Sequence, residues 1–188
     1  MTDQQTAKPI REAVGIFFDS HKLEETIKDL QESGFQHDEI GLLAGKFTVR
    51  EKLGHLYEEI NEDADSSGAP DTAFVAKESV GDTVHALLGT LYLTGAAVAG
   101  GAVVASAGIL GGAIAAAAAT TAVFSGVGAL LAVIIHESDA EYLEEQVDEG
   151  HLLLFVRTQD EEREELAVNI LSRHAAFDPR VYSLKAAD

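Results

Sequence analysis

The sequence predicts an α+β fold in which two βαβ halves build one domain around a long insert. Apolar runs of strand length alternate with amphipathic helix patterns near both ends of the chain. The order strand, helix, strand occurs once in each end region, as in an internal duplication. Between the two ends, residues 83–136 contain no Asp, Glu, Lys or Arg. This block therefore follows different physical rules from the rest of the chain.

The first half is expected to occupy residues 12–45, after a disordered tail at 1–11. Ala13–Phe18 is an apolar run of strand length, and Asp19 follows as an N-cap for a helix. Apolar residues then recur at the spacing of one helix face: Leu23, Ile27 and Leu30. Glu39–Ala44 is apolar again and predicts the second strand.

The second half is expected to occupy residues 137–188. A helix is predicted from Ser138, and Leu152–Val156 is an apolar strand. Thr158, with a glutamate three residues later, is a capping-box signal for the next helix. The buried face of that helix is predicted from three apolar residues: Leu166, Ile170 and Leu171. Val181–Leu184 is the last predicted strand.

Two such halves, each with a right-handed crossover, make a four-stranded antiparallel sheet with two helices on one face. This is the split ferredoxin-like arrangement, α+β in class. Neither half can bury its own sheet face, so we expect the halves to dock together.

Residues 46–82 are expected to form an acidic helical insert and linker. Thr48 and Glu51 have capping-box spacing. The apolar residues that follow fit one helix face: Val49, Leu53, Leu56, Tyr57 and Ile60. A polar linker is expected at 61–70.

The block at 83–136 predicts an inserted Gly/Ala-rich α-helical hairpin. Its glycines cluster near the midpoint, which leaves arms at 86–107 and 113–135 of about 20 apolar residues each, enough to cross a bilayer core. Small residues let helices approach closely. The residues expected to pack or turn the hairpin are Gly89, Gly95, Gly100, Gly101, Gly108, Gly111, Gly112, Gly126 and Gly128.

The hairpin has two interpretations. If both halves form one domain, the two ends of the hairpin emerge on the same side of a membrane. We then expect an inner (cytoplasmic) membrane protein with both termini in the cytoplasm, whose hairpin spans the lipid bilayer or re-enters it. Alternatively, the hairpin is buried in a soluble cytoplasmic homo-oligomer, because alanine and glycine are only moderately apolar.

Charge and composition restrict the partners. The 188 residues include 32 Asp and Glu against 13 Lys and Arg, a net charge of −19. Such a surface repels nucleic acids and anionic lipid headgroups, so no nucleic-acid partner is expected. The absence of cysteine rules out disulfides and thiolate chemistry. The start of the chain lacks the apolar core of a signal peptide.

The sequence contains few motifs that would indicate catalysis, a cofactor or a metal site. No P-loop, Gly-x-Ser-x-Gly elbow or Glu-x-x-His pair is found, so we expect no enzyme, no catalytic residue and no cofactor. Glu51, His55 and Glu59 share one face of the predicted helix and are weak metal candidates. A solvated acidic face explains them more simply.

Two stretches resemble the bacterial general-stress (heat-induced stress) protein family. The first is Ala-Val-Gly-Ile-Phe-Phe-Asp-Ser at 13–20, with Gly-Phe-x-x-Asp-x-Ile-x-Leu-Leu-Ala at 34–44. The second is Tyr-Leu-Glu-Glu-Gln-Val-Asp-Glu-Gly at 142–150, running into Leu-Leu-Leu-Phe-Val-Arg at 152–157. The resemblance implies a stress-linked, often membrane-associated protein with a Gly/Ala-rich segment between its halves. It transfers no catalytic residues, and the segment 46–82 departs from it.

The sequence therefore leads to a non-enzymatic, stress-related structural or interaction protein that the hairpin anchors or oligomerises. The alternative is a binding module that senses a small ligand or a metal. A ferredoxin-like enzyme would need polar groups that converge in a pocket, and no motif indicates them. The sequence does not name a protein partner.

Overall fold

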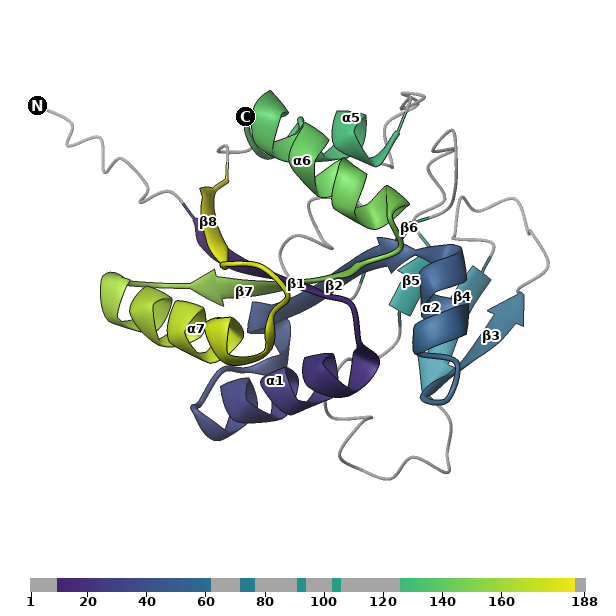
Figure 1. Cartoon of the computed structure of the whole chain (residues 1–188), viewed down its shortest axis with the longest axis horizontal. Helices are drawn as coiled ribbons and strands as arrows, with labels where there is room; N and C mark the ends of the chain where they lie inside the picture. Colours follow the sequence, from purple (N-terminus) through teal and green to yellow (C-terminus); the bar gives the residue numbers. More distant parts are fainter. Residues whose placement is uncertain (1–9, 62–71, 77–90, 94–102, 106–125, 185–188) are drawn as a thin grey trace, which may run out of the picture.

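The computed structural model describes residues 10–61, 72–76, 91–93, 103–105 and 126–184 (Figure 1). Its elements in chain order are β1 (Arg11–Phe17), α1 (Ser20–Glu32), a 3-10 turn η1 (His37–Glu39), β2 (Ile40–Gly45), α2 (Lys46–Lys52), β3 (Tyr57–Asn61), β4 (Thr72–Ala76), β5 (Leu91–Leu93), β6 (Val103–Ala105), α5 (Val127–Leu131), α6 (Glu137–Asp148), β7 (Leu152–Thr158), α7 (Glu161–His174) and β8 (Arg180–Ser183).

The centre of the sheet is an antiparallel pair formed by β1 and β7. Its register runs from Arg11 opposite Thr158 to Phe17 opposite Leu152. Strand β8 flanks β1 and β2 flanks β7, both antiparallel, so the order is β2-β7-β1-β8. The prediction of a four-stranded antiparallel sheet from these segments is confirmed.

Helices α1 and α7 lie side by side on one face of this sheet, below it in Figure 1. The predicted stripe of α1 is buried in full at Leu23, Ile27 and Leu30. The cap of α1 is also as predicted, because an Asp19 oxygen accepts from the Lys22 backbone N–H at 3.1 Å. Residues that alternate along β1 and β7 meet these helices, as the period of two in a strand requires.

The start of α7 differs from the prediction. Asp160 is its N-cap and accepts from the Arg163 backbone N–H at 2.8 Å. Thr158 instead belongs to β7, where its hydroxyl donates to the Arg11 carbonyl at 3.1 Å. Pairing with β1 extends the strand to Thr158, and the helix begins only after it. Leu166, expected on the buried face, is 38% exposed, whereas Ile170 and Leu171 are buried.

The opposite face of the sheet is covered by α5 and α6, which lie above it in Figure 1. The second apolar cluster joins these helices to the other alternate residues of the strands: Val14, Ile16, Leu43, Val127, Leu130, Leu131, Ile134, Ile135, Ala140, Leu143, Val147, Leu153, Phe155, Tyr182 and Leu184. The sheet is therefore the middle layer of three. Covering of this second face was not predicted, since the sequence pattern placed two helices on one face only.

The inserted segments also differ from the predictions. A helix ends at Lys52, and the residues from Tyr57 form strand β3, so the long helix expected after Thr48 is wrong. Gly45 precedes α2 without a side-chain cap, and Thr48 lies inside it. Strands β3, β4, β5 and β6 extend the sheet beyond β2 to eight strands.

The continuous helical arms of the hairpin are contradicted where the structure describes them. Within the first arm, β5 and β6 are strands that pair with each other, and β6 also pairs with β2. Within the second arm, α5 spans only Val127–Leu131, and Ile134 and Ile135 are buried in the domain core. Apolar composition with Ala and Gly does not by itself separate a helix from a buried strand. The turn expected at Gly108–Gly112 lies outside the described residues.

None of the helices in the described ranges has both the length and the apolar character that crossing a membrane demands. The predicted tail also ends earlier than residue 11. Arg11 begins β1, and the Ile10 carbonyl accepts from the Leu184 backbone N–H at 2.8 Å.

A buried carboxylate joins the two halves at the edge of the first face. Glu39 accepts from Arg163 at 2.8 Å, from the Gln159 side chain at 2.8 Å and from the Gln36 backbone N–H at 2.9 Å. The Arg163 guanidinium also lies 3.9 Å from the centre of the Phe35 ring. The loop before β2 is thus tied to α7 by a charge pair with little exposure to water.

We expect residues 1–61 and 126–188 to fold together but not separately. Both neighbours of β1 in the sheet, β7 and β8, lie in the second fragment, and both neighbours of β7, β1 and β2, lie in the first. Each fragment alone would therefore leave the backbone hydrogen-bonding groups of its central strand without partners. Circular dichroism and amide proton dispersion should show two poorly folded chains that become ordered when mixed. A cooperative thermal transition in either fragment alone would contradict the expectation.

We expect Arg163→Ala to lower the free energy of unfolding by roughly 2–4 kcal/mol, because it leaves the buried Glu39 carboxylate without its counter-charge. Arg173→Ala is the matched control, because Arg173 is largely exposed and its ion pair with Asp29 is long, at 3.9 Å. Its loss should cost less than about 1 kcal/mol. Urea denaturation measures the free energy of unfolding of both variants. Equal losses would show that the buried pair of Glu39 and Arg163 stabilises the domain no more than an exposed ion pair does.

Candidate functional site

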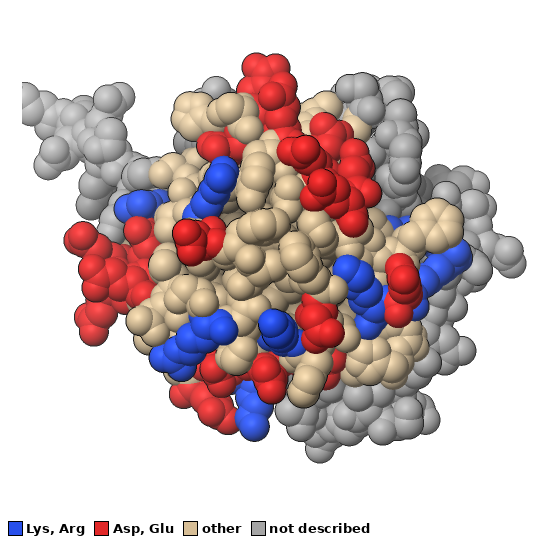
Figure 2. All heavy atoms as spheres, viewed as in Figure 1, with Lys and Arg blue, Asp and Glu red and all other residues tan. Residues whose placement is uncertain are grey.

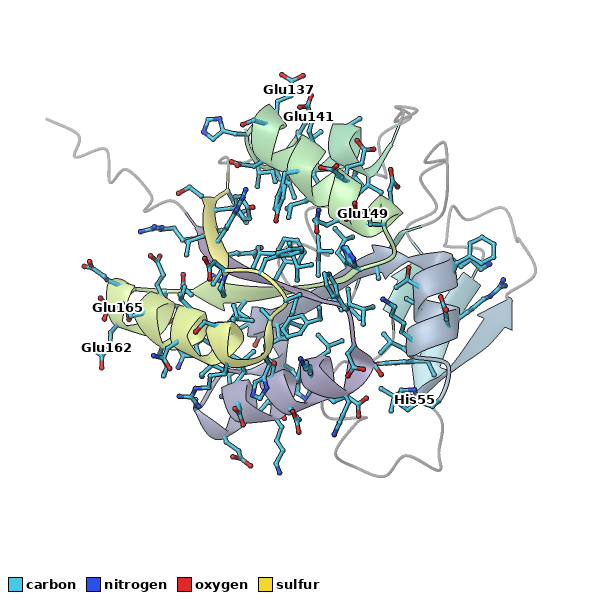
Figure 3. All side chains as sticks on the ribbon, viewed as in Figure 1. His55, Glu137, Glu141, Glu149, Glu162 and Glu165 are labelled. Carbon is cyan, nitrogen blue, oxygen red and sulfur yellow. The ribbon has the colours of Figure 1, made fainter. Side chains whose placement is uncertain are left out.

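The three weak metal candidates are not brought together on one helix. Glu51 lies in α2, His55 in the turn after it, and Glu59 in β3. His55 instead points to α1, with its Nε2 atom 3.2 Å from Glu24 Oε1 (Figure 3). Within the described residues, no group of three or more His, Asp or Glu side chains is arranged to hold a metal ion. The helix-face geometry behind the metal prediction is therefore wrong, because the helix ends before His55.

Two of the expected packing glycines are described, and both lie inside the domain. Gly126 precedes α5 and Gly128 lies in its first turn. A Cβ atom at either position would collide with the Glu144 carboxyl group of α6. These glycines therefore let α5 approach α6 closely. The other glycines of the expected hairpin, from Gly89 to Gly112, lie outside the described residues.

The most unusual polar group is a carboxyl buried in the second face of the sheet. Glu12 of β1 is only 2% exposed, and it lies opposite Arg157 of β7 and Tyr182 of β8. Its Oε2 atom accepts no hydrogen bond from the described residues. Burial raises the pKa of Glu12 to about 7, and the Arg157 charge opposes this only in part. The domain thus holds a carboxyl that titrates near neutral pH.

Tyr182, the neighbour of Glu12 on β8, lies among aromatic and basic side chains. Arg180 of β8 lies over the Tyr142 ring of α6, with its guanidinium carbon 3.9 Å from the ring centre. Burial raises the pKa of Tyr182, while the nearby Arg180 charge lowers it and Asp139 of α6 raises it further. Among the residues that the structure describes, this group includes no set of side chains arranged to hold a metal ion. We assign it a role in the pH dependence of stability.

A second group is exposed at the other end of the central strands. Phe18, His151 and Phe177 form a ring cluster, with ring centres 4.3 Å apart for Phe18 and His151 and 5.4 Å for Phe18 and Phe177. Phe18 is 49% and Phe177 44% exposed. Figure 2 shows that uncharged surface fills the middle of the face where β1 passes into α1, with charged side chains around it.

Two side chains contact His151 at its Nδ1 atom. Its Nδ1 atom lies 3.2 Å from Gln146 Oε1 and 3.6 Å from Glu149 Oε2. Lys52 of α2 donates to the neighbouring Gly150 carbonyl at 2.7 Å. Burial lowers the pKa of His151, Glu149 raises it, and Lys52 lowers it further. The net shift is downward, which favours the neutral ring at neutral pH.

Comparison with known proteins adds no relative. No protein-family model matches the chain, and neither a curated protein nor a solved structure matches it significantly.

The sequence reasoning missed both the Glu12 group and the ring cluster. A signal for each was present. Glu12 comes just before the predicted strand at 13–18, in which the even positions Val14 and Ile16 are apolar. If the strand begins earlier, the alternation places Glu12 on the same face as these two residues. Phe18 is a second phenylalanine after Phe17, and adjacent strand residues point to opposite faces. One of the two rings therefore had to leave the first core.

We expect Glu12→Gln to flatten the pH dependence of stability between about pH 4.5 and pH 7. The folded-state pKa of about 7 lies above the ordinary glutamate value of 4.5. Folding therefore favours the protonated acid, and its stabilisation is present at low pH and lost as the pH rises through 7. The full difference is about 3 kcal/mol. Urea denaturation across this range measures the slope.

The matched control is Glu162→Gln, which removes one exposed carboxylate from α7. It should leave the slope of stability against pH nearly unchanged. Equal slopes for Glu12→Gln and the wild-type chain would contradict the expectation, whatever the absolute cost of burying an amide.

Proposed function

We propose that the chain is a non-enzymatic structural or interaction protein, built on a split ferredoxin-like domain that carries a self-associating Gly/Ala-rich block. The strand order β2-β7-β1-β8, the antiparallel pairing and the placement of α1 and α7 on one face support the split ferredoxin-like assignment. The order within each half is strand, helix, strand, as a duplication of one βαβ unit would produce.

The observation that carries this role is the filled second face of the sheet. A small-ligand site needs a concave surface with a few convergent polar groups. Here apolar side chains of α5 and α6, among them Leu130, Leu131 and Leu143, pack directly on the strands. The sheet face that an open two-layer domain would offer to a ligand is used for packing. This favours a scaffold over a small-ligand or metal sensor.

Self-association follows from the composition of the block. Residues 94–125 contain no charged side chain and consist mainly of alanine, glycine and valine. Small residues favour close approach between neighbouring backbones. The net charge of −19 opposes the crowding of copies, so apolar contacts must hold them together. We propose a homo-oligomer, in a stress-related role to which the resemblance with general-stress proteins points.

We expect the full chain to be oligomeric and to assemble more strongly as salt is added, because salt screens the repulsion between acidic copies. Replacing Gly100 and Gly101 by leucine should shift the particle toward monomer, since larger side chains separate the backbones. Light scattering after size exclusion measures the mass at each salt concentration.

The control is Glu162→Gln with Glu165→Gln, which reduces the charge of α7 and should not weaken assembly. A monomer at every salt concentration would contradict the proposal. Carbonate extraction of expressing cells separates the two settings. Release of the oligomer by carbonate indicates assembly without insertion, and retention with the lipid fraction indicates a membrane-anchored form.

A further inference from the structure

We propose that the ring cluster of Phe18, His151 and Phe177 is a docking surface for a basic segment of a partner protein, one that presents Lys or Arg side chains. The inference names a partner for the interaction role proposed above, but it uses other residues than the Gly/Ala-rich block.

The register of the sheet brings the three rings together. Phe17 pairs with Leu152, so the next positions along the antiparallel pair are Phe18 and His151. On the other side of β1, the Ala176 backbone N–H donates to the Ile16 carbonyl at 2.7 Å, which draws Phe177 toward the end of the strand. Phe18 is thus the central ring of the cluster.

The rings form walls at different angles. Phe18 and His151 are stacked at 30°, whereas Phe177 meets Phe18 at 82° and His151 at 69°. Each ring face carries negative electrostatic potential, which attracts a cation placed over it. A cation that approaches the exposed parts of Phe18 and Phe177 therefore meets aromatic surface. The two half-exposed phenylalanines also leave apolar area that a partner would cover.

Three carboxylates lie near the rings in sequence or in space. Asp19 follows Phe18 and Asp178 follows Phe177 along the chain, and Glu149 Oε2 lies 3.6 Å from His151 Nδ1, with a side chain 53% exposed. Asp19 and Asp178 are also exposed. Lys52 carries a positive charge near His151, and its ammonium donates to the Gly150 carbonyl at 2.7 Å. Because burial lowers the pKa of His151, its ring stays neutral and does not repel a cation at neutral pH.

Charge also decides between a partner and a second copy. Two copies that met through this cluster would each bring a net charge of −19, with Glu149 beside His151 in each copy. Like charges across an interface oppose association, whereas a basic segment neutralises them. The cluster therefore fits an oppositely charged partner better than itself.

The test is a titration of the full chain with a fluorescein-labelled synthetic peptide that alternates arginine with glycine, followed by fluorescence anisotropy. Phe18→Leu with Phe177→Leu keeps apolar bulk and removes the aromatic faces. We expect this variant to bind roughly tenfold more weakly. Phe47→Leu is the matched control, since Phe47 on α2 is 79% exposed and belongs to no ring contact with the cluster. Its affinity should be unchanged.

Charge is tested by a second matched pair. Glu149→Gln and Glu162→Gln each remove one carboxylate, at the end of α6 beside His151 and on α7 away from it (Figure 3). Only the first should weaken binding. Thermal melting checks that each variant is folded.

Several results would overturn the proposal. These are no binding by the wild-type chain, equal binding of a glutamate–glycine peptide, equal loss in both members of either matched pair, or full binding by the leucine variant. The mass of the same variants, measured by size exclusion, tests whether a second copy of the chain binds the cluster instead. If the leucine substitutions reduce the mass of the particle and leave peptide binding intact, the cluster joins two copies and the proposal is wrong. A monomeric wild-type chain that binds the peptide as expected would contradict self-association only.

Discussion

The pairing of β1 with β7 is the constraint on which the rest of the structure depends. These strands lie near opposite ends of the chain, yet they are the central pair of the four-stranded unit, with seven residues in register. Everything between them along the sequence must leave this unit and return to it. The energetic reason is that both strands are apolar on both faces and can bury them only between two layers of helices.

The register of this pair also distributes the polar groups. Because side chains alternate along a strand, Phe17 enters the first core and Phe18 must leave it. The same alternation places Glu12 with Val14 and Ile16, on the face that α6 covers. A one-residue slip would exchange the two sets and bury Arg11 in place of Glu12. The ring cluster and the buried carboxyl therefore lie at opposite ends of β1, and the register of β1 with β7 fixes the face on which each lies.

The sequence could predict those elements that leave a local pattern of apolar residues. The four strands of the unit follow from apolar runs of strand length and the helices α1 and α7 from helix stripes, and the structure confirms them. The helix expected after Thr48 failed at one residue. Gly54 lies in the turn after α2, where a Cβ atom would collide with the Arg50 carbonyl, so this turn requires glycine. Leu56 and Tyr57 still fit the apolar face of a longer helix, and that spacing alone led to the wrong prediction. A glycine within a helix pattern indicates such an end as readily as it indicates tolerance.

The three-dimensional arrangement of the second face could not be predicted in the same way. The apolar residues of α5 and its following turn belong to a block whose length matches a membrane hairpin, and their composition alone suits lipid or a protein core equally. The strands decide between lipid and a protein core, because Phe155 of β7 and Val14 of β1 would face water if α5 and α6 did not cover them. The candidate docking surface is similarly non-local. Three rings from three connections become one surface only after β7 and the start of β8 settle beside β1. In the proposed docking, the net charge of the chain sets the sign of the partner, and the register of β1 with β7 sets where that partner binds.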